Sequence, residues 1–144
     1  MPADTMVEKD LLQYVDAHRA DLISILQDLV RIPSENTPPT GAEGDCQRYC
    51  EAALKASGFA TDLYELNAVP QLTAHPLYFP GRDYPGRPNL AARRPGSGGG
   101  RSLILSGHVD TVPRGTLPWT RDPFSGHIEN GLLYGRGSND MKAG

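Results

Sequence analysis

Ser102-Leu-Ile-Leu-Ser106, followed by Gly107-His-Val-Asp110, is the stretch that decides the fold. Its first five residues form a short apolar run with polar ends, which is typical of a strand buried on both faces. Strands of this kind lie in sheets that helices cover. The run therefore indicates an α/β fold in which a central sheet is flanked by helices.

Two helices are predicted on the amino-terminal side of this strand. Apolar residues recur at three- and four-residue spacing from Leu11 to Val30, which predicts an amphipathic helix. Thr40-Gly-Ala-Glu43 has the spacing of a capping box, so a second helix is predicted from there to about Ser57. Gly58 is placed to close that helix in a left-handed conformation.

Strands and loops are predicted for the remainder of the chain. Residues 67–88 contain five prolines, which predicts a long irregular loop. Asn130-Gly131 lies between two apolar runs, and this is the strongest short hairpin signal. The further strands expected are residues 59–66, 89–93, 127–129 and 132–134.

The composition indicates a single globular domain. The chain has 144 residues, of which 38% are hydrophobic, and its formal net charge is −3. It has no basic stripe, which argues against nucleic acid or anionic lipid as the main partner. No apolar run approaches the ~20 residues of a membrane span, and residues 1–10 lack the apolar core of a secretory signal. A cytoplasmic location without membrane association is therefore expected.

His108 and Asp110 are the first candidate site residues. In an extended chain, side chains two residues apart project to the same side. Zinc binds imidazole nitrogen well, and a ligand histidine needs a partner on its other ring nitrogen. His108 as a metal ligand oriented by Asp110 is therefore a physically sensible pair. The pattern alone is weak, because most His-x-Asp pairs on strands are structural.

Asp140 is the second candidate, and two interpretations are open. It follows Gly135 and Gly137, which let the backbone turn sharply and approach a ligand closely. Its two carboxylate oxygens would be free, one for each of two metal ions. Alternatively, Asp140 is the N-cap of a helix that begins there, and spacing alone favours the cap.

Cys46 and Cys50 also allow two interpretations. Their four-residue spacing puts them on one face of a helix, where they would form half of a metal site. Two cysteines cannot make a disulfide framework. Small core residues in a reducing compartment are the simpler interpretation.

Two dense motifs together resemble one metallopeptidase family. The first motif is Ser106-Gly-His-Val-Asp-Thr-Val-Pro113, with Trp119 and Asp122-Pro-Phe-Ser-Gly126 after it. The second is Asn130-Gly-Leu-Leu-Tyr-Gly-Arg-Gly-Ser-Asn-Asp-Met-Lys-Ala-Gly144. The helix that runs into Leu29-Val-Arg-Ile-Pro-Ser34 is similar too. The family is that of acetylornithine deacetylase, succinyl-diaminopimelate desuccinylase, aminoacylase and glutamate carboxypeptidase.

The resemblance implies a role for each of the three candidate residues. His108 matches the terminal ligand on one metal, Asp110 the carboxylate that orients it, and Asp140 the carboxylate that bridges two zinc ions. The peptide bond between Asp140 and Met141 is cis in the family. The implied cofactor is two Zn²⁺ ions per full-length subunit, with Co²⁺ as a second candidate. The implied activity is hydrolysis of an amide bond in an N-acyl amino acid or small peptide.

Other parts of the family pattern have no counterpart in this sequence. The resemblance places a Glu-Glu pair after the second motif, as general base and metal ligand, and then a further acidic ligand and a late histidine. An inserted dimerisation domain and the carboxy-terminal half are also absent. Residues 1–144 are therefore expected to be a partial catalytic domain whose full-length parent is a homodimer. The alternative is a catalytically dead binding or regulatory fragment that retains the fold.

The remaining polar residues are assigned structural roles. His18, His75 and His127 match no ligand position of the family. Arg136 and Lys142 are expected to be solvated or paired charges.

Overall fold

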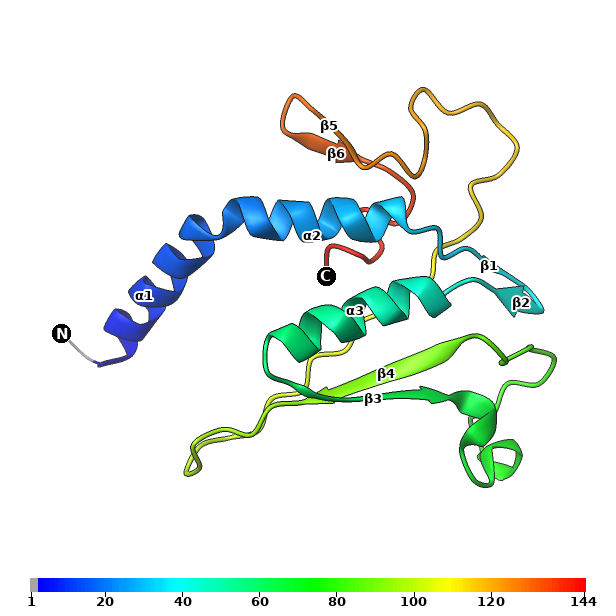
Figure 1. The fold of residues 1–144 in the computed structure, drawn as a ribbon, viewed down its shortest axis with the longest axis horizontal. Helices are drawn as coiled ribbons and strands as arrows, with labels where there is room; N and C mark the ends of the chain where they lie inside the picture. Colours follow the sequence, from blue (N-terminus) through cyan, green and yellow to red (C-terminus); the bar gives the residue numbers. More distant parts are fainter. Residues whose placement is uncertain (1–2) are drawn as a thin grey trace.

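The structure is a computed structural model that describes residues 3–144, and it begins with two helices (Figure 1). These are α1 (Ala3–Ala17) and α2 (Arg19–Arg31), so the prediction of one continuous helix is wrong. The division falls at His18, whose backbone leaves the helical range with φ −106° and ψ 15°. The second helix ends because Ile32, which precedes Pro33, is extended with φ −90° and ψ 107°.

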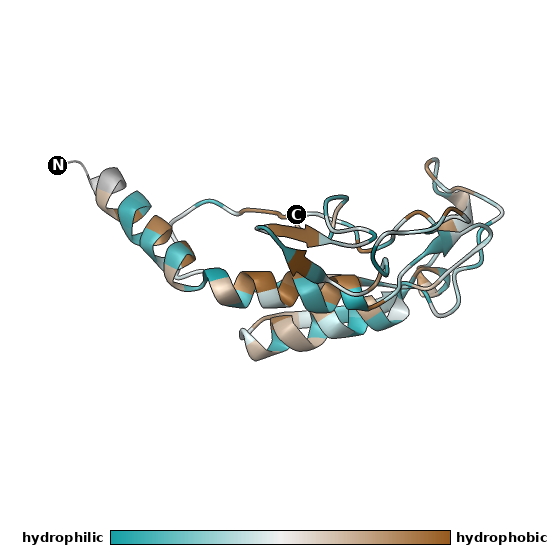
Figure 2. Ribbon diagram, turned by 90° about the horizontal axis from the view of Figure 1, so that it is seen from above, coloured by the Kyte–Doolittle hydropathy of each residue, from teal (hydrophilic) through white to brown (hydrophobic). Residues whose placement is uncertain are grey.

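Most of the apolar stripe on these two helices is exposed. In Figure 1, α1 extends beyond the rest of the molecule, and Figure 2 shows hydrophobic and hydrophilic residues alternating along both helices. In α2 only Leu29 and Val30 are buried, so the contacts that hold this helix gather at its carboxyl end. None of the helices that the structure describes is long and apolar enough to cross a membrane.

The third helix, α3 (Gly44–Ala56), begins later than predicted, and the predicted capping box is wrong. Thr40 lies instead in β2 (Thr40–Gly41), which pairs antiparallel with β1 (Asn36–Thr37). The Glu43 carboxylate makes no cap, because it accepts two hydrogen bonds from the Arg87 guanidinium at 2.8 and 2.7 Å. A bidentate pair between a guanidinium and a carboxylate adds geometric specificity as well as energy.

The carboxyl end of α3 confirms the prediction of a left-handed closure. Gly58 has φ +80°, and its N–H donates to the Lys55 carbonyl at 3.0 Å. The N–H of Phe59 donates to the Leu54 carbonyl at 3.0 Å. These bonds satisfy carbonyls that a helix end would otherwise leave free.

Helix α3 packs on a sheet of two antiparallel strands, β3 (Ala60–Glu65) and β4 (Pro88–Arg93) (Figure 1). Both strands confirm the prediction, and the pairing runs from Ala60 opposite Arg93 to Glu65 opposite Pro88. The proline-rich loop between them is irregular apart from two 3-10 turns, η1 (Leu66–Ala68) and η2 (Leu72–Ala74).

The last hairpin has the predicted bounds. Strand β5 (His127–Glu129) pairs antiparallel with β6 (Leu132–Tyr134). Asn130 and Gly131 both have positive φ, at 52° and 77°. This is the combination that a two-residue type I′ turn requires, and asparagine and glycine tolerate it best.

The predicted central sheet is absent from residues 3–144. The architecture is mixed α and β, but its strands form three separate two-stranded sheets. Residues 102–106 have no regular secondary structure and lie outside these sheets. The three apolar side chains of the run are 82–88% exposed: Leu103, Ile104 and Leu105. A strand needs a neighbouring strand for its backbone hydrogen bonds, and no described strand provides one here.

This exposed apolar run should make the chain bind hydrophobic dyes. We expect the fluorescence of anilinonaphthalene sulfonate to rise strongly with the wild-type chain. The triple variant Leu103→Ser, Ile104→Ser, Leu105→Ser should remove most of the rise. Leu77→Ser is the control, because Leu77 is a single leucine in the proline-rich loop and is 84% exposed. A monomeric sample that melts sharply without dye binding would contradict the expectation.

Candidate metal centre

The segment that carries His108 and Asp110 is fixed to the loop after α2. The Ser34 hydroxyl donates to the Val109 carbonyl at 2.6 Å, and the Thr111 N–H donates to the Ser34 carbonyl at 2.9 Å. Ser34 is fully buried and Thr111 is nearly so. The backbone around His108 is therefore positioned by buried contacts to a part of the chain about 75 residues away.

The loop that carries Asp140 is held by two glycines in close contact with other segments. A Cβ on Gly135 would collide with Val30, and a Cβ on Gly137 would collide with the Thr111 side chain. Gly137 also has φ +83°, a conformation that other residues rarely adopt. The glycines do allow a close approach, as predicted, but to neighbouring side chains of this chain.

Lys142 holds the same loop to α2. Its ammonium donates to the carbonyls of Leu29 and Ile32 at 2.7 and 2.8 Å. The residue is only 6% exposed, so the interpretation of Lys142 as a solvated or paired charge is wrong. A cation at the carboxyl end of a helix satisfies free carbonyls and interacts favourably with the helix dipole. Burial lowers the pKa of this lysine, and the nearby thiols of Cys46 and Cys50 partly oppose that effect.

These segments bring the three candidate residues together. The His108 Nε2 atom lies 3.1 Å from an oxygen of Asp140, and Nδ1 lies 3.1 Å from an oxygen of Asp110. Nδ1 also contacts the backbone carbonyl of Asp110 at 3.1 Å. The three side chains therefore meet, and they do so beside a segment that belongs to no strand. The Asp140–Met141 peptide bond is cis.

The Asp140 side chain contacts His108 and is 84% exposed. The chain continues from it as turns and not as a helix, so the helix-cap interpretation has no support in the described residues.

Two carboxylates determine the charge state of His108. Partial burial lowers the pKa of its imidazole, but the hydrogen bond to Asp110 and the charges of Asp110 and Asp140 outweigh this, so the pKa is raised overall. The carboxylates that favour a proton on the ring would equally attract a divalent cation. The electrostatics of the site therefore suit a metal ion.

The donor set of His108 and Asp140 fits zinc. Zinc takes imidazole nitrogen and carboxylate oxygen at about 2.0–2.2 Å, which puts neighbouring tetrahedral ligand atoms about 3.3 Å apart. The observed separation of Nε2 and the Asp140 oxygen is 3.1 Å. Within residues 3–144, however, no group of three or more His, Cys, Asp or Glu side chains is arranged to hold a metal. These residues therefore supply at most part of a metal site.

The other candidate residues do not join this centre. Cys46 is fully buried and Cys50 partly so, and both thiols are free, which agrees with their interpretation as core residues. Among the histidines, His18 contacts the Tyr14 carbonyl, and His127 lies 3.9 Å from Glu129.

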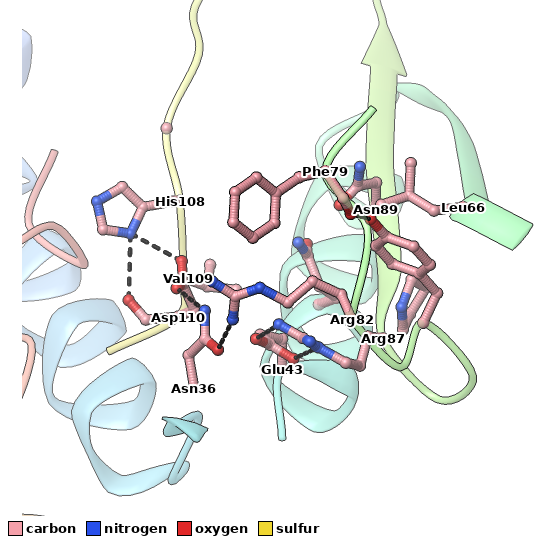
Figure 3. Close-up of a pocket in the computed structure, with 14 residues that line it drawn as sticks. Asn36, Glu43, Leu66, Phe79, Arg82, Arg87, Asn89, His108, Val109 and Asp110 are labelled. Carbon is pink, nitrogen blue, oxygen red and sulfur yellow. Dashed lines mark hydrogen bonds and ion pairs between the residues drawn. The ribbon is translucent and has the colours of Figure 1, made fainter. Parts of the chain in front are cut away.

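Sequence reasoning missed two polar residues beside the centre. The Asn36 amide donates to the second carboxylate oxygen of Asp110 at 2.9 Å, and Arg82 donates to the Asn36 amide oxygen at 3.1 Å. Figure 3 shows these residues around a cavity of about 380 Å³ that His108 and Asp110 also line. Asn36 begins the short strand β1 and Arg82 lies in the proline-rich loop, and neither segment carries a motif that would have indicated the contact.

The segment that carries His108, Asp110 and Asp140 is similar in sequence to known proteins. Residues 104–144 match the model of the peptidase family M20/M25/M40. The succinyl-diaminopimelate desuccinylase of Methylobacterium radiotolerans is 37% identical over 131 residues, which cover 90% of this chain and 28% of that protein.

A second desuccinylase, from Methylocella silvestris, is 37% identical over 127 residues, which cover 88% of this chain and 27% of that protein. The N-formyl-4-amino-5-aminomethyl-2-methylpyrimidine deformylase of Halalkalibacterium halodurans is 30% identical over 141 residues, which cover 96% of this chain and 29% of that protein. The chain is therefore similar to the peptidase family M20/M25/M40 over residues 104–144 and to these relatives over most of its own length. It spans less than a third of the length of these curated relatives.

Proposed function

We propose that residues 1–144 form part of the catalytic domain of a zinc-dependent hydrolase of amide bonds in N-acyl amino acids or small peptides. The observation that supports this most directly is the meeting of His108, Asp110 and Asp140 within hydrogen-bond distance. The relatives named as desuccinylases and as a deformylase remove acyl groups, which supports the substrate class. A full-length homodimer with two zinc ions is part of the same proposal.

In this proposal each of the three residues has a separate task. His108 and Asp140 would hold the metal, and Asp110 would fix the ring orientation of His108 through Nδ1. When bound, zinc would supply Lewis acidity for hydrolysis of the amide. The Asn36 amide donates to one carboxylate oxygen of Asp110 and His108 contacts the other, so two successive contacts would orient the imidazole.

Asp110→Asn tests the orienting role. Loss of an outer partner of a ligand histidine typically reduces metal affinity or activity by about 10–100-fold. We expect the Asp110→Asn variant of a polypeptide of the relatives' length to keep its zinc and to hydrolyse substrate about 10–100-fold more slowly. The measurement is zinc content by mass spectrometry beside the rate of amide hydrolysis. Asp62→Asn, at an exposed position of β3, is the matched control. A complete loss of zinc in Asp110→Asn would make Asp110 a ligand and contradict its orienting role.

A second candidate function is a binding or regulatory chain without turnover. It is favoured by the lack of any three-ligand metal group within residues 3–144. The sequence also contains no Glu-Glu pair, and the resemblance assigns the general base to such a pair.

We therefore expect the 144-residue chain to show no amidase activity with added zinc. General base catalysis alone contributes about 10²–10⁴ in rate. The measurement is release of the free amine from an N-succinyl amino acid. Zinc-dependent release that His108→Ala abolishes would contradict this expectation.

A further inference from the structure

The cavity beside the candidate metal centre contains a cation that the proposed function does not use. Arg82 comes from the proline-rich loop and lines the cavity together with His108 and Asp110 (Figure 3). The cavity volume of about 380 Å³ is within the range of small-molecule sites.

Arg82 has unused hydrogen-bonding capacity. A guanidinium offers five N–H donors, and one nitrogen of Arg82 donates to Asn36 at 3.1 Å. Its guanidinium carbon lies 5.5 Å from the centre of the Phe79 ring, which holds the group in place without accepting a strong hydrogen bond. No carboxylate among the described residues forms an ion pair with Arg82.

Arg87 on the same loop provides the contrast. It makes a bidentate pair with Glu43 at 2.7 and 2.8 Å, and both side chains are largely buried. Its charge is therefore neutralised within the chain, and the pair fixes the loop to the start of α3. Arg82, by contrast, lines the cavity without an ion pair to any carboxylate of the described residues.

Arg82 is connected to the candidate centre through a single amide. The Asn36 amide oxygen accepts from Arg82, and its nitrogen donates to Asp110, which contacts His108. A ligand bound at Arg82 would therefore lie in the same cavity as His108, at a short distance along it.

We propose that Arg82 recognises a free carboxylate of the substrate, so that the amide bond to be hydrolysed extends toward His108. The inference takes the substrate class from the proposed function. A carboxylate matches the guanidinium fork in geometry. A phosphate would carry a second negative charge into a cavity that Asp110 also lines, and like charges at short range repel.

The test is a metal-free titration of the ¹⁵N-labelled chain with succinate, followed by nuclear magnetic resonance. We expect the Arg82 Nε–H signal to shift and saturate. Arg82→Gln should weaken succinate binding, read from backbone signals around Asn36, by about tenfold or more, because hydrogen bonds to charged groups are the strong ones. Arg82→Lys, which keeps the charge and loses the fork, should be intermediate. Arg101→Gln removes the same charge from an exposed position and should bind like the wild type.

Several results would overturn the inference. If neutral succinamide bound as tightly as succinate, carboxylate recognition would be excluded. An equal loss of affinity in Arg101→Gln would show only a general ionic attraction, and tighter binding of inorganic phosphate would make this a phosphate site. Absence of saturation with the wild type would exclude a site altogether. Zinc binding is measured separately on a polypeptide of the relatives' length, so a lack of zinc binding there together with succinate binding here would refute the proposed function and leave this site standing.

Discussion

Replacing Asp140 by alanine should reduce the zinc affinity of the chain by about 100-fold or more. The estimate is a lower bound, because loss of an outer partner already reduces metal affinity by about 10–100-fold and Asp140 is proposed to contact the ion directly. In a polypeptide of the relatives' length the effect should be larger, since a bridging carboxylate would serve two ions. The measurement is isothermal titration with zinc in the presence of a competing chelator.

Two further variants make this result interpretable. His108→Ala should show a comparable loss in the 144-residue chain, because it removes the other proposed ligand. Asp62→Ala removes an exposed carboxylate from β3 and should leave the zinc affinity unchanged. Retention of wild-type zinc affinity by Asp140→Ala would refute the bridging role, whatever the other two variants did.

Replacing Lys142 by methionine should lower the free energy of unfolding by about 2–4 kcal/mol. Methionine keeps much of the volume of the side chain but leaves the Leu29 and Ile32 carbonyls without their donor. An unsatisfied buried polar group costs about 1–3 kcal/mol. The effect matters because the described hydrophobic residues that are buried number only three: Leu29, Val30 and Cys46.

Urea denaturation followed by circular dichroism measures this loss. Lys55→Met is the control, because Lys55 pairs with Glu51 one turn away at 2.8 Å and is 58% exposed. Surface pairs of this kind contribute about 0.2–1 kcal/mol. Equal destabilisation by both substitutions would show that the buried hydrogen bonds of Lys142 contribute nothing beyond a surface charge.

Features that depend on local chemistry were predictable from the sequence. The bounds of β5 and β6 follow from Asn130-Gly131, because the turn conformation is determined by those two residues. Gly58 closes α3 for the same reason. The identity of His108, Asp110 and Asp140 as a group came from a resemblance between motifs, and the structure shows that they meet.

Features that depend on distant partners were not predictable. Glu43 has the spacing of a capping residue, but Arg87, 44 positions later, takes its carboxylate. Residues 102–106 have the composition of a buried strand, but strand formation needs a neighbour that the described residues do not offer. Lys142 was expected to be a surface charge, because the sequence does not show that its ammonium contacts the carboxyl end of α2.

The contacts that build the candidate centre also determine when it can form during folding. Ser34 and Val109 are 75 positions apart, and Lys142 and Leu29 are 113 apart. The chain loses conformational entropy when it closes a loop of this length, and it does so before the new contacts can stabilise the fold. Folding rates therefore fall as contacting residues lie further apart in sequence. The hairpin of β5 and β6 and helix α3 can form quickly on their own, whereas the centre assembles only when residues 29–36 contact residues 109–142. In refolding, the ability to bind zinc should therefore appear after most of the helical signal has returned.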